Sequence, residues 1–159
     1  MSSELIHRHC PSPNCNERAL PVSMVVLHYT GMRSADEALA RLCDEEAQVS
    51  AHYMIDEDGT VTALVPEEKR AWHAGRSYWR GITDVNSASI GIELVNPGHE
   101  FGYRPFPRAQ MDALLPLLAE IVKRHDVPRA NVVGHSDVAP ARKEDPGELF
   151  DWDLLAKHR

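Results

Sequence analysis

The chain has 159 residues, of which 43% are hydrophobic and 26% charged, so it has the size and composition of one folded domain and not of a disordered chain, a fibre or a coiled coil. Its 24 acidic residues outnumber its 17 lysines and arginines and give a net charge of −7. A surface of that sign repels phosphate backbones, so no nucleic acid is expected as a partner.

The sequence carries no sign of a membrane span or an export signal. Its longest apolar run, residues 113–119, is far shorter than the ~20 residues that cross a bilayer. Glu4 stands where a signal peptide needs basic residues followed by an apolar run. The three cysteines, an odd number, fit a reducing compartment better than a set of disulfides. We therefore expect a cytoplasmic protein without membrane insertion, and no obligate protein partner is evident.

The N-terminal residues have no periodic pattern and are rich in Pro, Ser, Asn and Cys. We expect residues 1–21 to form an irregular arm that lies on the domain formed by residues 22–159. The arm contains two histidines and two cysteines, but their spacing is not that of known zinc sites, so a surface arm is favoured over a zinc knuckle. These residues are His7, His9, Cys10 and Cys15.

The first half of the domain alternates strand and helix patterns. Residues 23–28 form a short β-branched run, typical of a buried strand, and residues 35–42 form a helix that Ser34 is suited to cap. Residues 49–55 and 61–65 flank an acidic turn that ends in glycine, which predicts a hairpin.

The second half begins with a strand over residues 89–95, whose alternation places Ile90 and Ile92 on one face and Glu93 on the other. Residues 107–125 repeat apolar side chains at helical spacing, and Pro116 should bend this helix.

A strand over residues 131–134 and a terminal helix near residues 151–157 complete the predicted elements. Strands interleaved with helices and hairpin segments indicate the α/β class, as a single domain with a mixed central β-sheet flanked by helices.

Two histidines occupy equivalent places in this pattern. His28 and His135 each follow a short apolar strand, and strands that end at one sheet edge can bring such side chains together. Asp145 follows ten residues after His135, before a Pro-Gly turn that can direct its carboxylate back. Two imidazoles and one carboxylate with one position left for water form a catalytic zinc pattern. The alternative is two hydrogen-bonded core histidines and a surface aspartate, and spacing alone does not decide between these readings.

Five separated segments resemble, in order, the zinc-dependent N-acetylmuramoyl-L-alanine amidases of the amidase-2 family, which are related to the peptidoglycan recognition proteins. The resemblance extends over about residues 23–155. The segments are VLHYT at 26–30, VSAHY at 49–53, RAWHAG at 70–75, SIGIEL at 89–94 and GHSDVAPARKEDPG at 134–147.

The resemblance implies a fold like that of these proteins, a Zn²⁺ site of His28, His135 and Asp145, and hydrolysis of the amide between the lactyl group of N-acetylmuramic acid and L-alanine. Lys143 is then expected to stabilise the oxyanion, and Glu93 to accept a proton from the attacking water. The alternatives are a solvated lysine and an exposed glutamate on a one-sided sheet.

The resemblance also implies a groove of substrate-binding residues beside the metal. It places Trp72, His73 and Ala139 there, and further candidates are Tyr29, His52, Trp79 and Arg142. His52 can instead support a metal ligand without touching substrate, and one of the two tryptophans can simply pack in the core. Relatives devoted to cytoplasmic cell-wall recycling carry Asn after the first ligand and basic residues before the VSxH motif, where this chain has Tyr29 and Gln48, so the preferred substrate is not fixed by these positions.

Three functions follow from this reading. The first is an amidase acting on muropeptides or anhydro-muropeptides in cell-wall recycling, with a peptidoglycan fragment as its substrate. The second is an amidase acting on intact peptidoglycan, and the third is a non-catalytic peptidoglycan-recognition module. Modules of the third kind arise where the third metal ligand is lost, so the presence of Asp145, Lys143 and Glu93 favours an enzyme.

Overall fold

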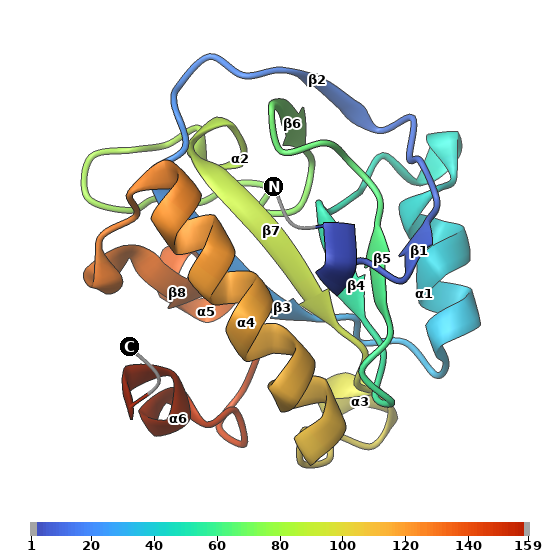
Figure 1. Cartoon of the computed structure of the whole chain (residues 1–159). Coiled ribbons are helices and arrows are strands. Elements are labelled where there is room, and N and C mark those ends of the chain that lie inside the picture. Colours follow the sequence, from blue (N-terminus) through green and yellow to red (C-terminus); the bar gives the residue numbers. More distant parts are fainter. Residues whose placement is uncertain (1–2, 158–159) are drawn as a thin grey trace.

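A mixed β-sheet with the strand order β1-β5-β4-β7-β3-β8 forms the centre of the computed structural model, which describes residues 3–157 (Figure 1). The neighbours β4, β7, β3 and β8 run parallel, and β5 is antiparallel to β4. The strands are β1 (Arg8–His9), β3 (Met24–Tyr29), β4 (Tyr53–Ile55), β5 (Val61–Ala63), β7 (Ser89–Leu94) and β8 (Val132–Gly134). The predicted α/β class and mixed sheet are confirmed.

The long helix α4 (Arg108–His125) crosses one face of the sheet (Figure 1). Its apolar side chains pack on alternate residues of β3, β4 and β7 and form the largest core cluster. Pro107 precedes its first turn, and Pro116 lies within it, as the sequence predicts. The spacing of apolar residues along α4 is therefore explained by burial against one sheet face.

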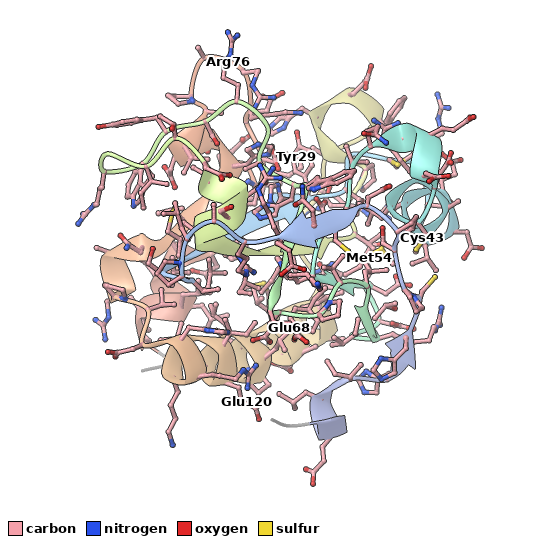
Figure 2. The ribbon with its side chains drawn as sticks, turned by 90° about the horizontal axis from the view of Figure 1, so that it is seen from above. Tyr29, Cys43, Met54, Glu68, Arg76 and Glu120 are labelled. Carbon is pink, nitrogen blue, oxygen red and sulfur yellow. The ribbon has the colours of Figure 1, made fainter. Side chains whose placement is uncertain are left out.

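Two smaller clusters cover the other face. One joins β3 to α2 (Val85–Ala88) and α5 (His135–Val138), and the other joins β4 to α1 (Ala35–Leu42). Figure 2 shows Glu120 of α4 on one side of the molecule and Tyr29 and Arg76 on the other. The segments around Tyr29 thus lie on the face of the sheet opposite α4, and this face carries the histidines described below.

Local signals in the sequence are matched by local structure. The Ser34 hydroxyl accepts a hydrogen bond from the Glu37 N–H at 3.1 Å and caps α1. Strands β4 and β5 form the predicted antiparallel hairpin around the acidic turn. Ile90 and Ile92 are buried against α4, whereas Glu93 faces the other side.

The N-terminal arm is more ordered than its sequence indicates. Residues 8–9 form β1, which extends the main sheet beside β5, and β2 (Cys15–Glu17) pairs with β6 (Lys69–Ala71). These strands were not predicted because two or three residues are too few to show a period, and pairing partners far along the chain hold them. Met1 and Ser2 of the predicted arm, and residues 158–159 of the predicted domain, lie outside the described residues.

The remaining elements are short. They are η1 (Ser3–Leu5), η2 (Glu45–Ala47), α3 (Gly98–Phe101), η3 (Arg129–Asn131) and α6 (Trp152–Lys157). Of these, only α6 is predicted from the sequence. Within the described part of the chain, no helix is both long enough and apolar enough to cross a bilayer.

Candidate metal centre

Three side chains far apart in the sequence meet at the carboxyl end of β3 and β8. His28 is the residue before the last one of β3. Leu27 pairs with Gly134 of β8, so His28 and His135 follow side by side. The Nδ1 atoms of His28 and His135 are 3.0 Å apart, and Asp145 Oδ2 lies 3.2 Å from each of them. The parallel sheet therefore brings together the group that the strand ends predict.

These ligand atoms are shielded from solvent and form a set that fits a divalent metal ion. His28, His135 and Asp145 are 1%, 4% and 6% exposed. Among residues 3–157 they form the one group of three or more such side chains close enough to share an ion. The His135 Nε2–H donates to the Ala74 carbonyl at 2.9 Å, so its Nδ1 presents a lone pair to the carboxylate. Lone pairs that converge in this way are stabilised by a cation.

The charge state of the group also suits a metal. Burial and the nearby His135 together lower the pKa of His28 to about 4, so its imidazole is neutral at neutral pH. Burial acts to raise the pKa of Asp145, but the neighbouring His135 and His28 outweigh it and hold that pKa below its usual range. Two neutral imidazoles and one carboxylate are the forms that bind metal.

Glu93 lies beside this group on β7, where it pairs with His28 in the sheet register. Its Oε2 is 3.9 Å from His28 Nδ1. Burial raises the pKa of Glu93 well above its usual range, and the Asp145 charge adds to the effect while Lys143 opposes it. A carboxylate with a raised pKa next to a metal group is suited to accept a proton.

A cavity of about 160 Å³ opens onto these residues and is lined by Glu93, Lys143, Tyr29, Trp72 and His73 as well as the three ligands. Lys143 is exposed at its rim. A second cavity of about 300 Å³ shares Tyr29 and Lys143 with the first and also contains Arg142. Four of the seven predicted substrate-binding residues thus line one or both cavities, namely Tyr29, Trp72, His73 and Arg142.

His52 is not among the residues that line the two cavities, and its contact with substrate stays a prediction. Its ring is completely buried. Nδ1 accepts from the Gly91 N–H at 3.0 Å, and Nε2 lies 2.9 Å from the Lys69 carbonyl oxygen, to which it donates. Both ring nitrogens are therefore used to join β7 to the segment around β6, and His52 has a structural role.

Trp79 and Ala139 are also not among the residues that line the two cavities. The Trp79 indole N–H donates to Asn131 Oδ1 at 3.1 Å, and its ring packs on the cluster that contains α2. Ala139 is buried at the end of α5, where its N–H donates to the His135 carbonyl. Ala139 thus supports the turn that carries His135.

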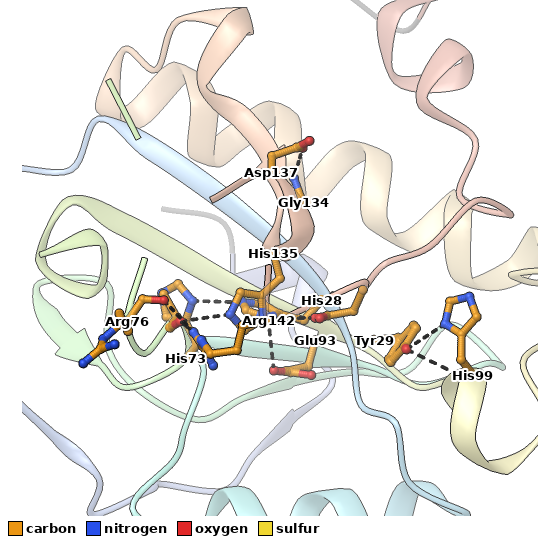
Figure 3. Close-up of polar contacts among 12 residues, drawn as sticks. His28, Tyr29, His73, Arg76, Glu93, His99, Gly134, His135, Asp137 and Arg142 are labelled. Carbon is orange, nitrogen blue, oxygen red and sulfur yellow. Dashed lines mark hydrogen bonds and ion pairs between the residues drawn. The ribbon is translucent and has the colours of Figure 1, made fainter. Parts of the chain in front are cut away.

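Arg142 has contacts that organise the groove. Its Nη2 donates to the carbonyls of Ala74 and Arg76 at 2.8 and 2.7 Å. Since Ala74 also accepts from His135, Arg142 holds the segment that positions this ligand (Figure 3).

His73, which the sequence predicts to bind substrate, also packs behind His28, and Ser89, which no sequence pattern pointed to, lies behind His73. His73 Nδ1 is 2.9 Å from His28 Nε2, and Ser89 Oγ is 3.0 Å from His73 Nε2. The His73 ring lies directly on Gly91, where an added Cβ would be 2.4 Å from the ring. Gly91 is the signal that was available, because a glycine inside a strand often marks the close approach of another group.

The fold and the site together define an α/β protein with a buried group of three side chains that fits a metal ion. Three protein ligands are typical of catalytic and not of structural metal sites. The amidase-2 family, described as "N-acetylmuramoyl-L-alanine amidase", matches residues 18–148, and the chain belongs to this family.

Two curated relatives are similar over most of this chain. N-acetylmuramoyl-L-alanine amidase AmiD of Escherichia coli (strain K12) is 43% identical over 148 residues, which are 86% of this chain and 52% of AmiD. The chain thus spans about half the length of that relative. The 1,6-anhydro-N-acetylmuramyl-L-alanine amidase AmpD of Enterobacter cloacae is 34% identical, over 91% of this chain and 86% of AmpD.

Two solved structures show the same fold. The complex of Escherichia coli AmiD with the substrate anhydro-N-acetylmuramic acid-L-Ala-D-gamma-Glu-L-Lys has a TM-score of 0.79 and 42% identity, and the match covers 88% of this chain and 59% of that chain. A crystal structure of a selenomethionine AmpD derivative has a TM-score of 0.84 and 32% identity, with coverage of 95% and 93%.

Proposed function

We propose that this protein is a zinc-dependent amidase that hydrolyses the amide bond between the lactyl group of N-acetylmuramic acid and the L-alanine of the stem peptide. We propose anhydro-muropeptides of cell-wall recycling as its substrates. The convergence of His28, His135 and Asp145 within 3.2 Å carries this proposal. The names of the relatives and the ligand of the solved AmiD complex support the choice of bond and substrate.

In this proposal His28, His135 and Asp145 hold Zn²⁺. Imidazole nitrogen and carboxylate oxygen are ligands that zinc commonly uses, and three of them leave a coordination position open. The ion supplies a Lewis acid that activates water and polarises the scissile carbonyl. The ligands themselves are fixed from behind, His135 by Ala74 and His28 by His73, so little reorganisation is needed on binding.

We assign the proton transfers to Glu93. Its carboxylate lies beside the ligand atoms and carries a raised pKa caused by burial. It accepts a proton from the attacking water at a carboxylate oxygen and then donates a proton to the alanine nitrogen as the amide bond breaks.

We assign oxyanion stabilisation to Lys143. Its ammonium group lies at the rim of the same cavity, two residues before Asp145. A positive charge held there stabilises the negative charge that develops on the carbonyl oxygen in the transition state.

Three residues of the groove are suited to bind the substrate. Tyr29 and Trp72 offer aromatic faces on the cavity walls, where sugar or peptide groups can pack. Arg142 places a guanidinium group in the adjoining cavity, where a stem-peptide carboxylate can pair with it.

Product analysis tests the proposed function. Purified protein is given anhydro-muropeptide and intact sacculi in parallel, and the products are identified by mass spectrometry. We expect release of the free stem peptide from anhydro-muropeptide and little release from sacculi. Equal release from both would instead support the intact polymer as substrate. Binding of muropeptide with no cleavage by the zinc-loaded protein would support a recognition module.

The cytoplasmic location expected from the sequence stays a prediction. Fractionation of the source cells, followed by detection of the chain with an antibody, would test it.

A further inference from the structure

We propose that Ser89 and His73 act as positioning residues that hold His28 in the tautomer whose Nδ1 is free to bind a metal ion. The inference rests on the metal site of the proposed function and adds residues that are not ligands. It is carried by a chain of buried hydrogen bonds that begins at a backbone carbonyl and ends at His28.

The direction of this chain is set by Ser89. Its hydroxyl has a single proton, and Ser89 Oγ donates to the Val85 carbonyl at 2.6 Å. A carbonyl oxygen can only accept. With its proton used in this way, Ser89 Oγ is left to accept from the ring of His73, 3.0 Å away.

His73 passes this direction on to His28. Because Nε2 of His73 carries the proton donated to Ser89, Nδ1 of the neutral ring is an acceptor. It lies 2.9 Å from His28 Nε2, which therefore carries a proton and donates. His28 Nδ1 is then bare and presents its lone pair to His135 and Asp145 (Figure 3).

Asp145 favours the other tautomer of His28, in which Nδ1 carries the proton. Its Oδ2 is 3.2 Å from His28 Nδ1 and would accept a proton from that nitrogen. For this to happen, the proton of His73 must move to Nδ1 and the Ser89 hydroxyl must turn away from Val85 toward His73. The short Ser89–Val85 hydrogen bond opposes this rearrangement.

The ring of His73 is held in place for this role. The N–H groups of His73 and Ala74 both donate to Asn86 Oδ1, at 3.0 and 2.7 Å. Gly91 leaves room for the ring against β7. Both Ser89 and Asn86 come from the segment that forms α2 and the start of β7. The residues that hold the His73 ring therefore come from the place where α2 joins β7.

The test compares Ser89→Ala with the control Ser87→Ala. Ser87 is equally buried on α2, but its hydroxyl accepts from the Ala19 N–H and is not part of the chain to His28. Zinc affinity is measured by competition with a chromogenic chelator. We expect Ser89→Ala to weaken zinc binding about 10- to 100-fold and Ser87→Ala to leave it within about twofold. Equal effects of the two substitutions would overturn the proposal.

Nitrogen-15 NMR of the histidine rings in the metal-free protein gives a readout that a merely structural role would not change. In the wild-type chain we expect His28 to carry its proton on Nε2 and His73 to do the same. In Ser89→Ala we expect a proton on Nδ1 of His28. A wild-type His28 protonated at Nδ1 would refute the assignment even where Ser89→Ala fails to fold. Neither measurement depends on amidase activity, so failure of the proposed function is distinguished from failure of this inference.

An independent observation concerns two thiols outside the site. Cys10 of the N-terminal arm and Cys43 at the end of α1 have sulfur atoms 3.2 Å apart. Both side chains are partly exposed, and neither is in a disulfide. We infer that Cys10 and Cys43 form a site of reversible oxidation that joins the arm to the helix whose residues Ala38, Arg41 and Leu42 line the candidate cavity.

The oxidant we name is a small disulfide such as oxidised glutathione. One thiolate, formed by loss of its proton, attacks a glutathione sulfur and releases one glutathione thiolate, which leaves a mixed disulfide. The second protein thiolate then attacks the protein sulfur and releases the other glutathione. Burial raises the pKa of Cys43, and the neighbouring Cys10 adds to this, so Cys43 is a poor first nucleophile.

Oxidation of the full chain tests this site. After treatment with oxidised glutathione we expect the number of free thiols to fall from three to one, with a Cys10–Cys43 link in the peptide map and a higher unfolding midpoint that reductant reverses. Cys15→Ser should still form the link, and Cys10→Ser should not. A link through Cys15, a stable glutathione adduct without a link, or three unreacted thiols would overturn the inference.

Discussion

The carboxylate of Glu93 is the group beside the ligand atoms that is free to move a proton, since Asp145 is used as a ligand. We expect Glu93→Gln to lower kcat by about 10²- to 10⁴-fold, because an amide of the same size cannot accept a proton from water. Zinc content should stay unchanged. Steady-state kinetics on anhydro-muropeptide, with metal analysis of the same samples, measures both quantities. The exposed Glu68 provides the control Glu68→Gln, which should keep wild-type kcat.

The Lys143 ammonium acts on the oxygen of the scissile carbonyl and not on the metal. Lys143→Ala should therefore lower kcat by about 10²-fold, as expected for loss of one oxyanion-stabilising group, and leave zinc content and KM nearly unchanged. A large rise in KM with an unaltered kcat would contradict this role and would place Lys143 in substrate binding.

At the scale of single residues, the sequence predicts the three candidate metal ligands but not the residues that hold them in place. His28, His135 and Asp145 follow from the strand ends and a turn, because parallel strands end at one edge of a sheet. The role of His52 stays a prediction, since its motif says nothing about which side of the sheet the ring occupies. The contact of His73 with Ser89 depends on how a loop folds onto β7, and no periodic pattern in the sequence reports that.

Among the elements, the length of a segment decides what could be predicted. Helix α4 and strands β3 and β7 have enough residues to show a hydrophobic period, and all three are confirmed. Helices α2, α3 and α5 have four residues each and show none. The arm strand β2 exists because β6 pairs with it, which is a property of the tertiary structure.

The loop that carries His73 packs onto β7 at Gly91, so a larger residue at this position should disturb both the fold and the site. In Gly91→Ala the new methyl group would lie 2.4 Å from the His73 ring, so the ring must move away from His28. We expect a loss of about 1–3 kcal/mol in the free energy of unfolding together with weaker zinc binding. Urea denaturation and chelator competition measure the two effects.

Ile90→Val is the control for that experiment. Ile90 is buried on the α4 face of the same strand, away from the site. This substitution should cost about 0.5–1.5 kcal/mol of stability and leave zinc affinity unaltered. If both variants weakened zinc binding in proportion to their loss of stability, the close contact of Gly91 with His73 would not be the cause.

At the scale of the whole molecule, Glu67 connects strand β4 to the C-terminal end of α4 through a cluster of hydrogen bonds. Arg124 Nε and Nη2 donate to its two carboxylate oxygens at 2.9 and 2.7 Å, the Tyr53 hydroxyl donates to it, and His125 Nε2 lies 2.7 Å from Oε1. Burial alone would raise the pKa of Glu67, but the hydrogen bonds from Arg124 and Tyr53 outweigh it and lower the pKa to about 2.

A lowered pKa in the folded state makes stability depend on pH in a defined direction. The ionised Glu67 stabilises the fold above its ordinary pKa of about 4.5, and this contribution is lost as pH falls from 4.5 toward 2. Allowing for partial solvent screening, Glu67→Gln should lower the free energy of unfolding by about 1–2 kcal/mol at pH 7. The difference from wild type should shrink as pH falls through that window. Urea unfolding of both chains at a series of pH values measures it, and a difference that stays constant down to pH 2 would show that the charge of Glu67 does not contribute.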